Sequence, residues 1–525
     1  MDKRTLRAYV HQVRQVRHVG VLALVAGLAG LAGLVGCAVG PNFKTPVAPV
    51  ADGASYTPEP IPAQTASSPG TGGAAQRFVT GMDIPAQWWS VFQSPALDQL
   101  LRGALAQNPN MAAAEAALRQ VRENYNAQAG QLVYPAVNGA LGASRQKTQV
   151  ATPGGTQAAV LNLYNASVNV SYTPDVFGAT RRTLEGAQAA VDYQRYQVEA
   201  TYLALSANVV TAAIQEASLR AQLQATRDVL AALTRQQNVI EKQFEFGAIA
   251  RAQVLSQRNL VAQTAATVPP LEKALAQTRH LLSTLAGKLP GEAGMPEFTL
   301  ASLTLPEALP VSLPSALVRQ RPDIRASEEL LRQASADIGV ATAAMYPQFT
   351  LSGSYGSASP TFSKLFEGDN AIWSLTAGLT APIFNGGALR ARKRASEAAY
   401  DVAAAQYRAT LLTAFQNVAD SLRALESDAA ALTAQAESEA LAAETLALSE
   451  EQYKLGAISY LSLLDAQRVF QQAHIGLVQA QAARYADTAA LFQALGGGWW
   501  NRADGVPAAV PVSTMPSLST ISQNP

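Results

Sequence analysis

Small apolar residues, chiefly alanine, are interspersed with glutamine and charged residues along two long stretches without proline, 179–246 and 388–455. Each stretch covers 68 residues (246 minus 179, and 455 minus 388, counted inclusively). Because proline breaks helices, its absence over such a length predicts one continuous helix in each stretch. At 1.5 Å per residue, each helix would be about 100 Å long.

The two long stretches end in the same short motif, at 243–249 and at 452–458. Both copies read Gln, an aromatic residue, two variable residues, then Gly-Ala-Ile, and they lie 209 positions apart (452 minus 243). A second helical stretch follows each motif, at 251–287 and 459–495. Since glycine commonly ends one helix before another begins, each motif predicts the turn of a helical hairpin.

Other landmarks recur at nearly the same offset. A proline follows a short helical segment in each half, a Tyr-Pro pair opens each strand-like region, and a glycine closes it. The separations are 213 for Pro109 and Pro322 (322 minus 109), 212 for Pro135 and Pro347 (347 minus 135), and 208 for Gly178 and Gly386 (386 minus 178). A period near 210 exceeds the repeat length of solenoid proteins and therefore predicts a duplicated half-domain.

The amino terminus has the organisation of an export signal. Basic residues within 1–18 precede an apolar, glycine-rich run at 21–36. The run leads into Leu-Val-Gly-Cys at 34–37, which resembles the bacterial lipoprotein box, and Cys37 is the only cysteine of the chain. We therefore expect Cys37 to be lipidated as the first residue of the mature chain; an ordinary signal with a chance cysteine is the alternative. Ala38, in place of an aspartate, favours sorting to the outer membrane.

Between the helical stretches the period of the apolar residues changes to two. Apolar and small polar residues alternate at 166–173, 349–355 and 373–380, and more weakly at 134–145. Strands of about ten residues with one apolar face and one small, polar face are typical of a membrane barrel. A soluble sandwich would show the same alternation, but the outer-membrane signal favours the barrel.

Four strands are too few to close a barrel. Every strand edge inside a bilayer must be paired, so several copies of the chain would have to pool their strands. Three chains would give twelve strands, although the sequence alone does not distinguish three from two or four. The expected fold is mainly α with a membrane β-barrel: a two-fold internal repeat with a long helical barrel and four strands per chain.

Shorter helices complete each half. One is expected at 94–107, and helices of about 24 and 23 residues precede the strands, at 110–133 and 323–345. A returning helix and a pre-strand helix together have nearly the same number of residues as one long helix. These lengths predict a tube wall built of helices; a long antiparallel coiled-coil scaffold is the alternative. The Val-Pro-Pro sequence at 268–270 should kink the first returning helix.

The segment before the first helix is rich in Pro, Ala, Gly, Ser and Thr, and is expected to be a tether mostly without regular structure. Folded protein should begin near Trp88. The expected organisation is a signal peptide (1–36), a lipid-anchored tether (37–82), a first repeat (83–290), an equatorial connector (291–313), a second repeat (314–500) and a disordered tail (501–525).

Composition argues against several classes of protein. The net charge is +1 and no basic patch suggests nucleic-acid binding. Beyond the signal only His280 and His474 remain, and both lie within helical stretches. The sequence has no G-x-S-x-G, phosphate-binding glycine loop or H-E-x-x-H motif. We expect neither an enzyme nor a metal site, and no cofactor apart from the covalent lipid on Cys37.

Several motifs together resemble the TolC-like outer-membrane factors, specifically the lipoprotein branch that serves multidrug (RND-type) efflux systems. They are Cys-Ala-Val-Gly-Pro-Asn-Phe at 37–43, Arg-Pro-Asp-Ile at 321–324, Pro-Ile-Phe-Asn-Gly-Gly at 382–387, Leu-Leu-Asp-Ala-Gln at 463–467, and Ala-Leu-Gly-Gly-Gly-Trp at 494–499. The resemblance covers nearly all of the mature chain to about residue 500.

This resemblance implies a homotrimer with a twelve-stranded barrel in the outer membrane and a helical tunnel in the periplasm. It also implies a periplasmic adaptor and an inner-membrane pump as partners. The expected function is a passive duct for small molecules, drugs or toxic compounds among them. The alternatives are a type I protein-secretion duct, or a lipid-anchored periplasmic coiled-coil scaffold without a pore.

The resemblance also implies a periplasmic gate at Leu461 and Asp465, supported by Tyr453. Leu461 and Asp465 are four residues apart and so share one helix face. Three-fold symmetry would then form an apolar ring and an acidic ring, which resist wetting and favour cations respectively. Pairing of Asp465 with Arg468 is the alternative. Some relatives have a second acid where this chain has Ser462.

The hairpin turns are the expected docking site for the adaptor. Gly247 and Gly456 would allow the turn, and Ala248 and Ala457 would leave room for a partner helix. The backbone requirement of the turn explains both glycines equally well.

Overall fold

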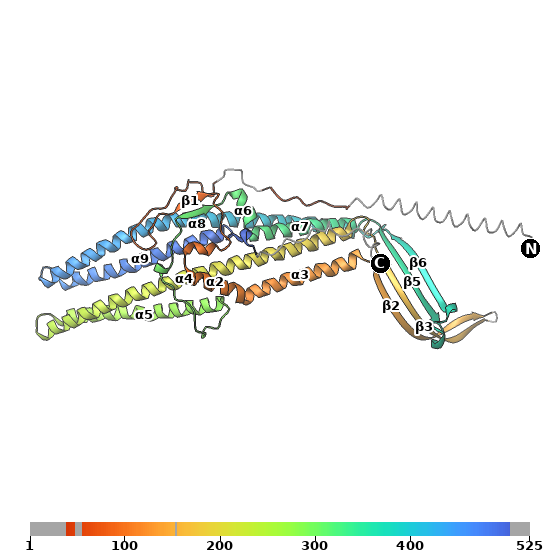
Figure 1. Ribbon diagram of the computed structural model, residues 1–525, viewed down its shortest axis with the longest axis horizontal. Helices are drawn as coiled ribbons and strands as arrows, with labels where there is room; N and C mark the ends of the chain where they lie inside the picture. Colours follow the sequence, from red (N-terminus) through yellow and green to blue (C-terminus); the bar gives the residue numbers. More distant parts are fainter. Residues whose placement is uncertain (1–37, 48–54, 153–154, 504–525) are drawn as a thin grey trace, which may run out of the picture. The chain divides into compact units, whose positions relative to one another are not determined.

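The computed structural model describes residues 38–47, 55–152 and 155–503 (Figure 1). The predicted lipidation site Cys37, the signal peptide and most of the predicted tail lie outside these residues. The chain forms two compact units. Of the described residues, the first unit, here called the strand unit, comprises 38–45, 120–152, 155–191 and 329–405; the second, the hairpin unit, comprises 46–47, 55–119, 192–328 and 406–503.

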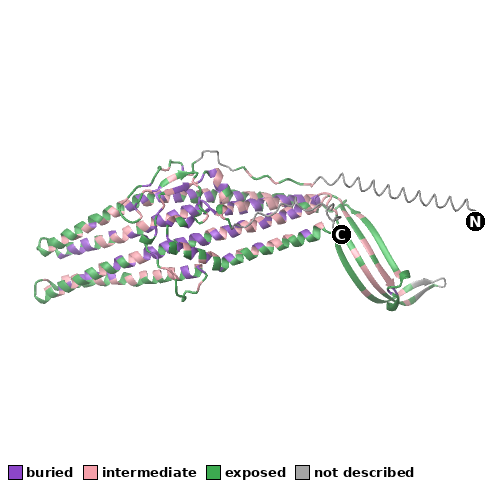
Figure 2. Ribbon diagram, viewed as in Figure 1, coloured by how far each residue is buried: buried purple, intermediate pink, exposed green. Residues whose placement is uncertain are grey.

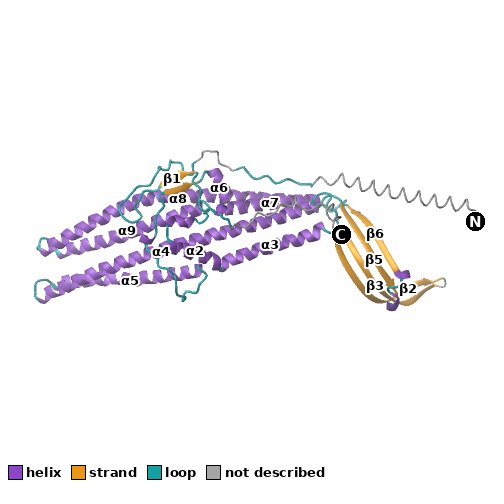
Figure 3. Ribbon diagram, in the orientation of Figure 1, coloured by secondary structure: helices purple, strands orange, loops and turns teal. Residues whose placement is uncertain are grey.

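The strand unit contains one antiparallel sheet with the order β2-β3-β5-β6 (Figure 3). Its strands are β2 (Ala136–Thr152), β3 (Gly155–Tyr172), β5 (Gln348–Ser359) and β6 (Ala371–Thr380). Each of the four predicted strands overlaps one of these elements: 349–355 and 373–380 lie wholly within β5 and β6, whereas 134–145 begins two residues before β2 and 166–173 ends one residue after β3. The expected length of about ten residues was wrong for β2 and β3, which have 17 and 18 residues. Their backbone pairing continues in register to the hairpin turn, beyond the region where the sequence alternates.

The register separates the side chains of the sheet into two faces. Val168 pairs with Tyr355, which pairs with Trp373, while their neighbours Asn169, Ser354 and Ser374 pair with one another. Because successive side chains point to opposite faces, one face is apolar and the other is small and polar. Large apolar side chains of the first face, those of Val168, Tyr355 and Trp373, are exposed. Figure 2 shows the strands coloured mainly as exposed or intermediate. Among the described residues, β2 and β6 each have only one neighbouring strand.

Four helices belong to two hairpins that match residue for residue. The first consists of α4 (Ala179–Glu245) and α5 (Arg251–Leu285), the second of α8 (Ala388–Lys454) and α9 (Tyr460–Ala494). The long helices have 67 residues each and the returning helices 35 each. Every helix end of the second hairpin lies 209 positions after its counterpart (388 minus 179, 454 minus 245, 460 minus 251, 494 minus 285). The predicted two-fold repeat is thus present in the fold.

Each half of the repeat also contains shorter elements. They are α3 (Pro109–Val133) and α7 (Pro322–Ala343), α2 (Pro95–Gln107) and α6 (Pro314–Gln320), β1 (Arg77–Thr80) and β4 (Ala308–Val311), and 3-10 turns at Trp88–Phe92, Leu300–Ser302, Phe362–Lys364, Gly368–Asn370 and Trp499–Asn501. No helix within the described ranges combines the length and the apolar character needed to cross a membrane. Pro269 and Pro270 lie inside α5 without interrupting it; the expected kink stays a prediction.

An aromatic core lies in the middle of the hairpin unit. Trp88 and Trp89 are wholly buried, and the Trp88 ring stacks on Phe492 with 5.8 Å between centroids. The indole N–H of Trp88 donates a hydrogen bond to the hydroxyl of Ser206 at 3.1 Å, so its polar atom is satisfied.

The segment expected to be a tether is fixed to this unit over much of its length. Most of it has no regular structure, as predicted, but β1 pairs in parallel with β4, and the side chains of Thr65 and Gln76 are buried. The composition indicated only that the segment cannot form helices or long strands. It did not show that side chains far away in the sequence bind its backbone.

Candidate functional site at the hairpin tips

The two hairpin turns have the same backbone geometry. Gly247 and Gly456 adopt φ angles of +72° and +73°, in the left-handed region. The amides of Ala248 and Ala457 donate to the carbonyl oxygens of Gln243 and Gln452, both at 2.8 Å, as in a Schellman turn. A Cβ atom at either glycine would meet nothing within 4 Å. The turn conformation, rather than lack of space, therefore explains the two glycines.

Both turns expose a large apolar side chain that sequence reasoning missed. Phe246 is 85% exposed and Leu455 83% exposed, and they are counterparts in the repeat. They occupy a variable position of the tip motif, which hides their shared apolar character. The helix ends just before these residues, so the turn projects both side chains away from the packed hairpins.

A buried cluster behind the tips joins the two hairpins. Its buried members, here called the tip cluster, are Leu233, Ile240, Val254, Leu260, Tyr460, Leu463 and Leu464. The side-chain amide of Gln257 accepts a hydrogen bond from the hydroxyl of Tyr460 and donates one to the carbonyl oxygen of Leu233 at 2.8 Å. No local pattern pointed to this polar link, because Gln257 is one of many glutamines in these helices.

The three predicted gate residues lie in two different environments. Tyr453 packs against the tip cluster, with its ring centroid 5.5 Å from that of Tyr460, and burial raises the pKa of its hydroxyl. Leu461, at 69% exposed, and Asp465 share the exposed face of α9 together with Val469. Asp465 has no ion pair with Arg468 within the described part of the chain.

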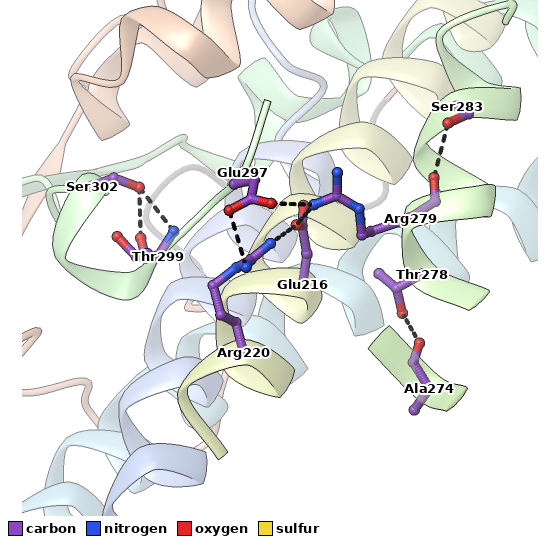
Figure 4. Close-up of polar contacts among 9 residues, drawn as sticks. All are labelled: Glu216, Arg220, Ala274, Thr278, Arg279, Ser283, Glu297, Thr299 and Ser302. Atoms are coloured by element: carbon purple, nitrogen blue, oxygen red, sulfur yellow. Dashed lines mark hydrogen bonds and ion pairs between the residues drawn. The ribbon is translucent and has the colours of Figure 1, made fainter. Parts of the chain in front are cut away.

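A buried charge network holds the first hairpin to the connector (Figure 4). Glu216 of α4 is completely buried and accepts hydrogen bonds from Arg220 at 2.8 Å and Arg279 of α5 at 2.9 Å. Glu297 of the connector pairs with the same two arginines, at 3.1 and 3.3 Å. Two carboxylates thus balance two guanidinium groups. The i,i+4 spacing of Glu216 and Arg220 was the only sequence signal.

A buried arginine fixes the amino-terminal segment to the other hairpin. Arg484 of α9 is fully buried and donates to the carbonyl oxygens of Gly72 at 2.7 Å and Ala74 at 3.0 Å. It also donates to the side chains of Thr65 and Gln76, both at 3.1 Å. The segment 55–76, here called the strap, is therefore held through its carboxy-terminal half, from Thr65 to Gln76, by one guanidinium group.

The strand unit contains a comparable contact near its amino-terminal end. Arg182 of α4 is buried and donates to the carbonyl oxygens of Val39 at 3.2 Å and Gly40 at 3.3 Å, and to Oδ1 of Asn42 at 2.7 Å. Its remaining partner is Glu185, at 2.7 Å. The residues that follow the predicted lipidation site are thus bound to the start of α4.

Known proteins resemble this chain over most of its length. The chain is 30% identical over 469 residues to the probable efflux pump outer membrane protein TtgC of Pseudomonas putida, covering 89% of this chain and 94% of that protein. It is 34% identical over 429 residues to the pyoverdine export outer membrane protein OpmQ of Pseudomonas aeruginosa, covering 80% and 89%.

Solved structures of outer-membrane channels share the fold. The outer-membrane channel OprN superposes with a TM-score of 0.80 at 27% identity, over 88% of this chain and all of that one. The open state of the MtrE channel of Neisseria gonorrhoeae gives 0.76 at 27% identity, over 88% and 99%. These likenesses confirm the expected TolC-like architecture.

The family model for outer membrane efflux proteins matches residues 100–288 and 313–497, one segment in each half of the repeat. Since both halves match, and the relatives and solved structures are efflux components and outer-membrane channels, the chain belongs to the outer membrane efflux protein family and is the outer-membrane channel of an efflux system.

Proposed function

We propose that three copies of the chain form a passive duct through the outer membrane, with a twelve-stranded barrel, a periplasmic helical part and an acyl anchor on Cys37. The observation that carries this proposal is the sheet of the strand unit. It has one apolar and one small, polar face, and two edges without a partner in the described chain. A bilayer tolerates such edges only when another chain pairs with them.

The duct would carry small molecules and obtain energy from its partners. Relatives are named for export of toluene, antibiotics and pyoverdine, which supports small, partly apolar compounds as cargo. We propose that a periplasmic adaptor docks at Gly247, Ala248, Gly456 and Ala457, and that an inner-membrane pump drives transport. The exposed side chains of Phe246 and Leu455 support this assignment, because each turn presents a large apolar side chain whose burial against a docked partner would be favourable.

The gate would be formed by Leu461 and Asp465 of three chains around the axis. Both side chains are exposed on one face of α9, so they are available to line a lumen. Tyr453 would support this face from behind through the tip cluster. The carboxylate ring would favour cations over anions, and the apolar ring would resist wetting and so hinder the passage of hydrated ions in general.

Two measurements on the detergent-extracted, lipidated protein test the proposal. A native mass of three chains, together with ion conductance in a planar bilayer, is the expected result. A single-chain mass without conductance would contradict the duct and favour the coiled-coil scaffold. Mass spectrometry of the amino-terminal peptide tests the anchor separately, because an unmodified Cys37 would leave the pore intact but remove the lipid.

A further inference from the structure

A cavity of about 220 Å³ lies within the hairpin unit, between α4 of the first hairpin and α8 and α9 of the second. Its lining includes three large apolar side chains, those of Leu233, Leu446 and Phe470, and two carboxylates, those of Asp228 and Glu450. No lysine or arginine of the described chain lines it. The cavity is therefore apolar and acidic, and has no permanently positive side chain of its own.

One polar side chain that lines this cavity lacks a hydrogen-bond partner. Gln467 of α9 is only 9% exposed, and its amide oxygen is buried without a partner in the part of the chain that the structure describes. A buried acceptor that lacks a donor costs free energy. A half-turn of the terminal torsion exchanges the oxygen and the nitrogen of the amide, so Gln467 can present its oxygen to a donor inside the cavity.

The repeat shows what occupies the corresponding place in the first hairpin. With the offset of 209 residues, Gln467 corresponds to Arg258 and Glu450 to Glu241 (467 minus 258, and 450 minus 241). Arg258 and Glu241 form an ion pair at 2.8 Å. In the second hairpin a shorter, neutral side chain replaces the arginine, and Glu450 has no ion pair with any described residue. A carboxylate and a cavity thus take the place of a carboxylate and a cation.

The cavity also has an aromatic wall whose counterpart in the first hairpin is aliphatic. The rings of Phe470 and His474 stack with their centroids 5.6 Å apart, and Nδ1 of His474 lies 3.0 Å from a carboxylate oxygen of Glu439. The counterparts of the two rings are Val261 and Ala265. An aromatic face attracts cations and also packs well against an apolar body. The second hairpin therefore combines an unpaired carboxylate, an unpartnered amide and an aromatic surface in one cavity.

We propose that this cavity binds a small organic cation, whose charged group lies between Glu450 and Gln467 and whose apolar part packs on Phe470. The cation would donate hydrogen bonds to the carboxylate and to the amide oxygen, as the arginine of the first hairpin does to Glu241. A cavity of 220 Å³ has room for about seven water molecules at ~30 Å³ each, which suits a cation with a single ring. Since its lining comes from both hairpins of one chain, a bound cation would hold the two hairpins together.

Benzamidine, a planar cation with one ring, is a suitable probe, and benzamide is its neutral analogue of nearly the same shape. Titration of the detergent-extracted protein, followed by ligand-observed NMR, should show saturable binding of benzamidine and at least tenfold weaker binding of benzamide. Glu450→Gln should weaken the binding of benzamidine at least tenfold, because it removes the carboxylate. Glu241→Gln is the matched control: its carboxylate is already paired with Arg258, so binding should not change.

Gln467→Arg tests the comparison between the two hairpins directly. The new arginine would supply the cation from the chain itself, so the variant should no longer bind benzamidine. If this variant fails to fold, Glu450→Gln decides alone, because Glu450 is exposed and its replacement leaves the packing intact. The site is wrong if the wild-type protein does not bind benzamidine, if benzamide binds equally well, or if Glu450→Gln binds as the wild type does. None of these results bears on the proposed duct, which the native mass and the conductance test separately.

Discussion

The hydroxyl of Tyr460 donates a hydrogen bond to the side-chain oxygen of Gln257, a residue from the other half of the repeat. Both side chains are buried in or beside the tip cluster. The hairpin that carries Leu461 and Asp465 is thus bound to its neighbour by a polar contact just behind the exposed face of α9. Since a buried polar atom loses its partner when this contact breaks, separation of the hairpins costs free energy here.

Tyr460→Phe should therefore loosen the two hairpins at their tips. The substitution leaves the buried oxygen of Gln257 without a donor, which costs about 1–3 kcal/mol. We expect faster amide hydrogen exchange in the tip-proximal turns of α5 and α9, by about tenfold or more, and a higher conductance. Tyr453→Phe is the matched control, because it removes a hydroxyl from a ring that packs on the same cluster. Equal effects of the two substitutions would show that the link contributes nothing.

Asp465→Ala should raise the single-channel conductance and weaken cation preference. The substitution removes one carboxylate per chain from the exposed face of α9, and with it the acidic ring that we propose. Ser256→Ala, at the counterpart position of α5, should leave both quantities unchanged. Unchanged current and selectivity in Asp465→Ala would exclude this residue from the gate.

Arg484→Gln should release the strap from α9. The wild-type guanidinium group makes four hydrogen bonds to the strap inside the protein, and a shorter neutral side chain cannot replace them. Cleavage within 55–76 by proteinase K should become at least several-fold faster. Arg423→Gln is the control: Arg423 pairs with the largely exposed Glu59 of the strap at 3.1 Å, and an exposed pair contributes little. Equal cleavage of both variants would argue against this role of Arg484.

The stability of the protein should depend on pH through Asp428. Burial, together with its hydrogen bond to the carboxyl group of Asp487, raises the pKa of Asp428 to about 7. Between pH 4 and 7 the unfolded chain loses this proton while the folded chain keeps it, so stability falls as pH rises through this window. Asp428→Asn should flatten this part of the curve of unfolding temperature against pH. An unchanged slope would show that Asp428 ionises normally.

The helices and the repeat could be predicted because their signals are local. Absence of proline, glycine at the turns and a constant offset define α4, α5, α8 and α9 to within a few residues. Strand length could not be read in the same way. The alternation fades towards the hairpin end of β2 and β3, while the backbone pairing persists.

Contacts between residues far apart in the chain could not be predicted from the sequence. The strap looks like a linker by composition, but Arg484, more than 400 positions away, fixes it. The resemblance singled out Leu461 and Asp465, their spacing of four residues predicted one shared helix face, and both residues are exposed on one face of α9. Nothing distinguished Gln257 from the other glutamines, since its importance comes from a tyrosine of the opposite half.

The equal lengths of corresponding helices limit how such a chain can change in evolution. The long helices have 67 residues each and the returning helices 35 each. One extra residue in a single long helix would advance its tip by about 1.5 Å and rotate it by about 100°, turning the side chains of the tip cluster away from their partners. A relative with longer or shorter helical hairpins therefore requires insertions or deletions at equivalent positions in both halves. A change of length in one half of the duplicated gene must be matched by an equal change in the other half, so that the two hairpin tips of the protein stay together.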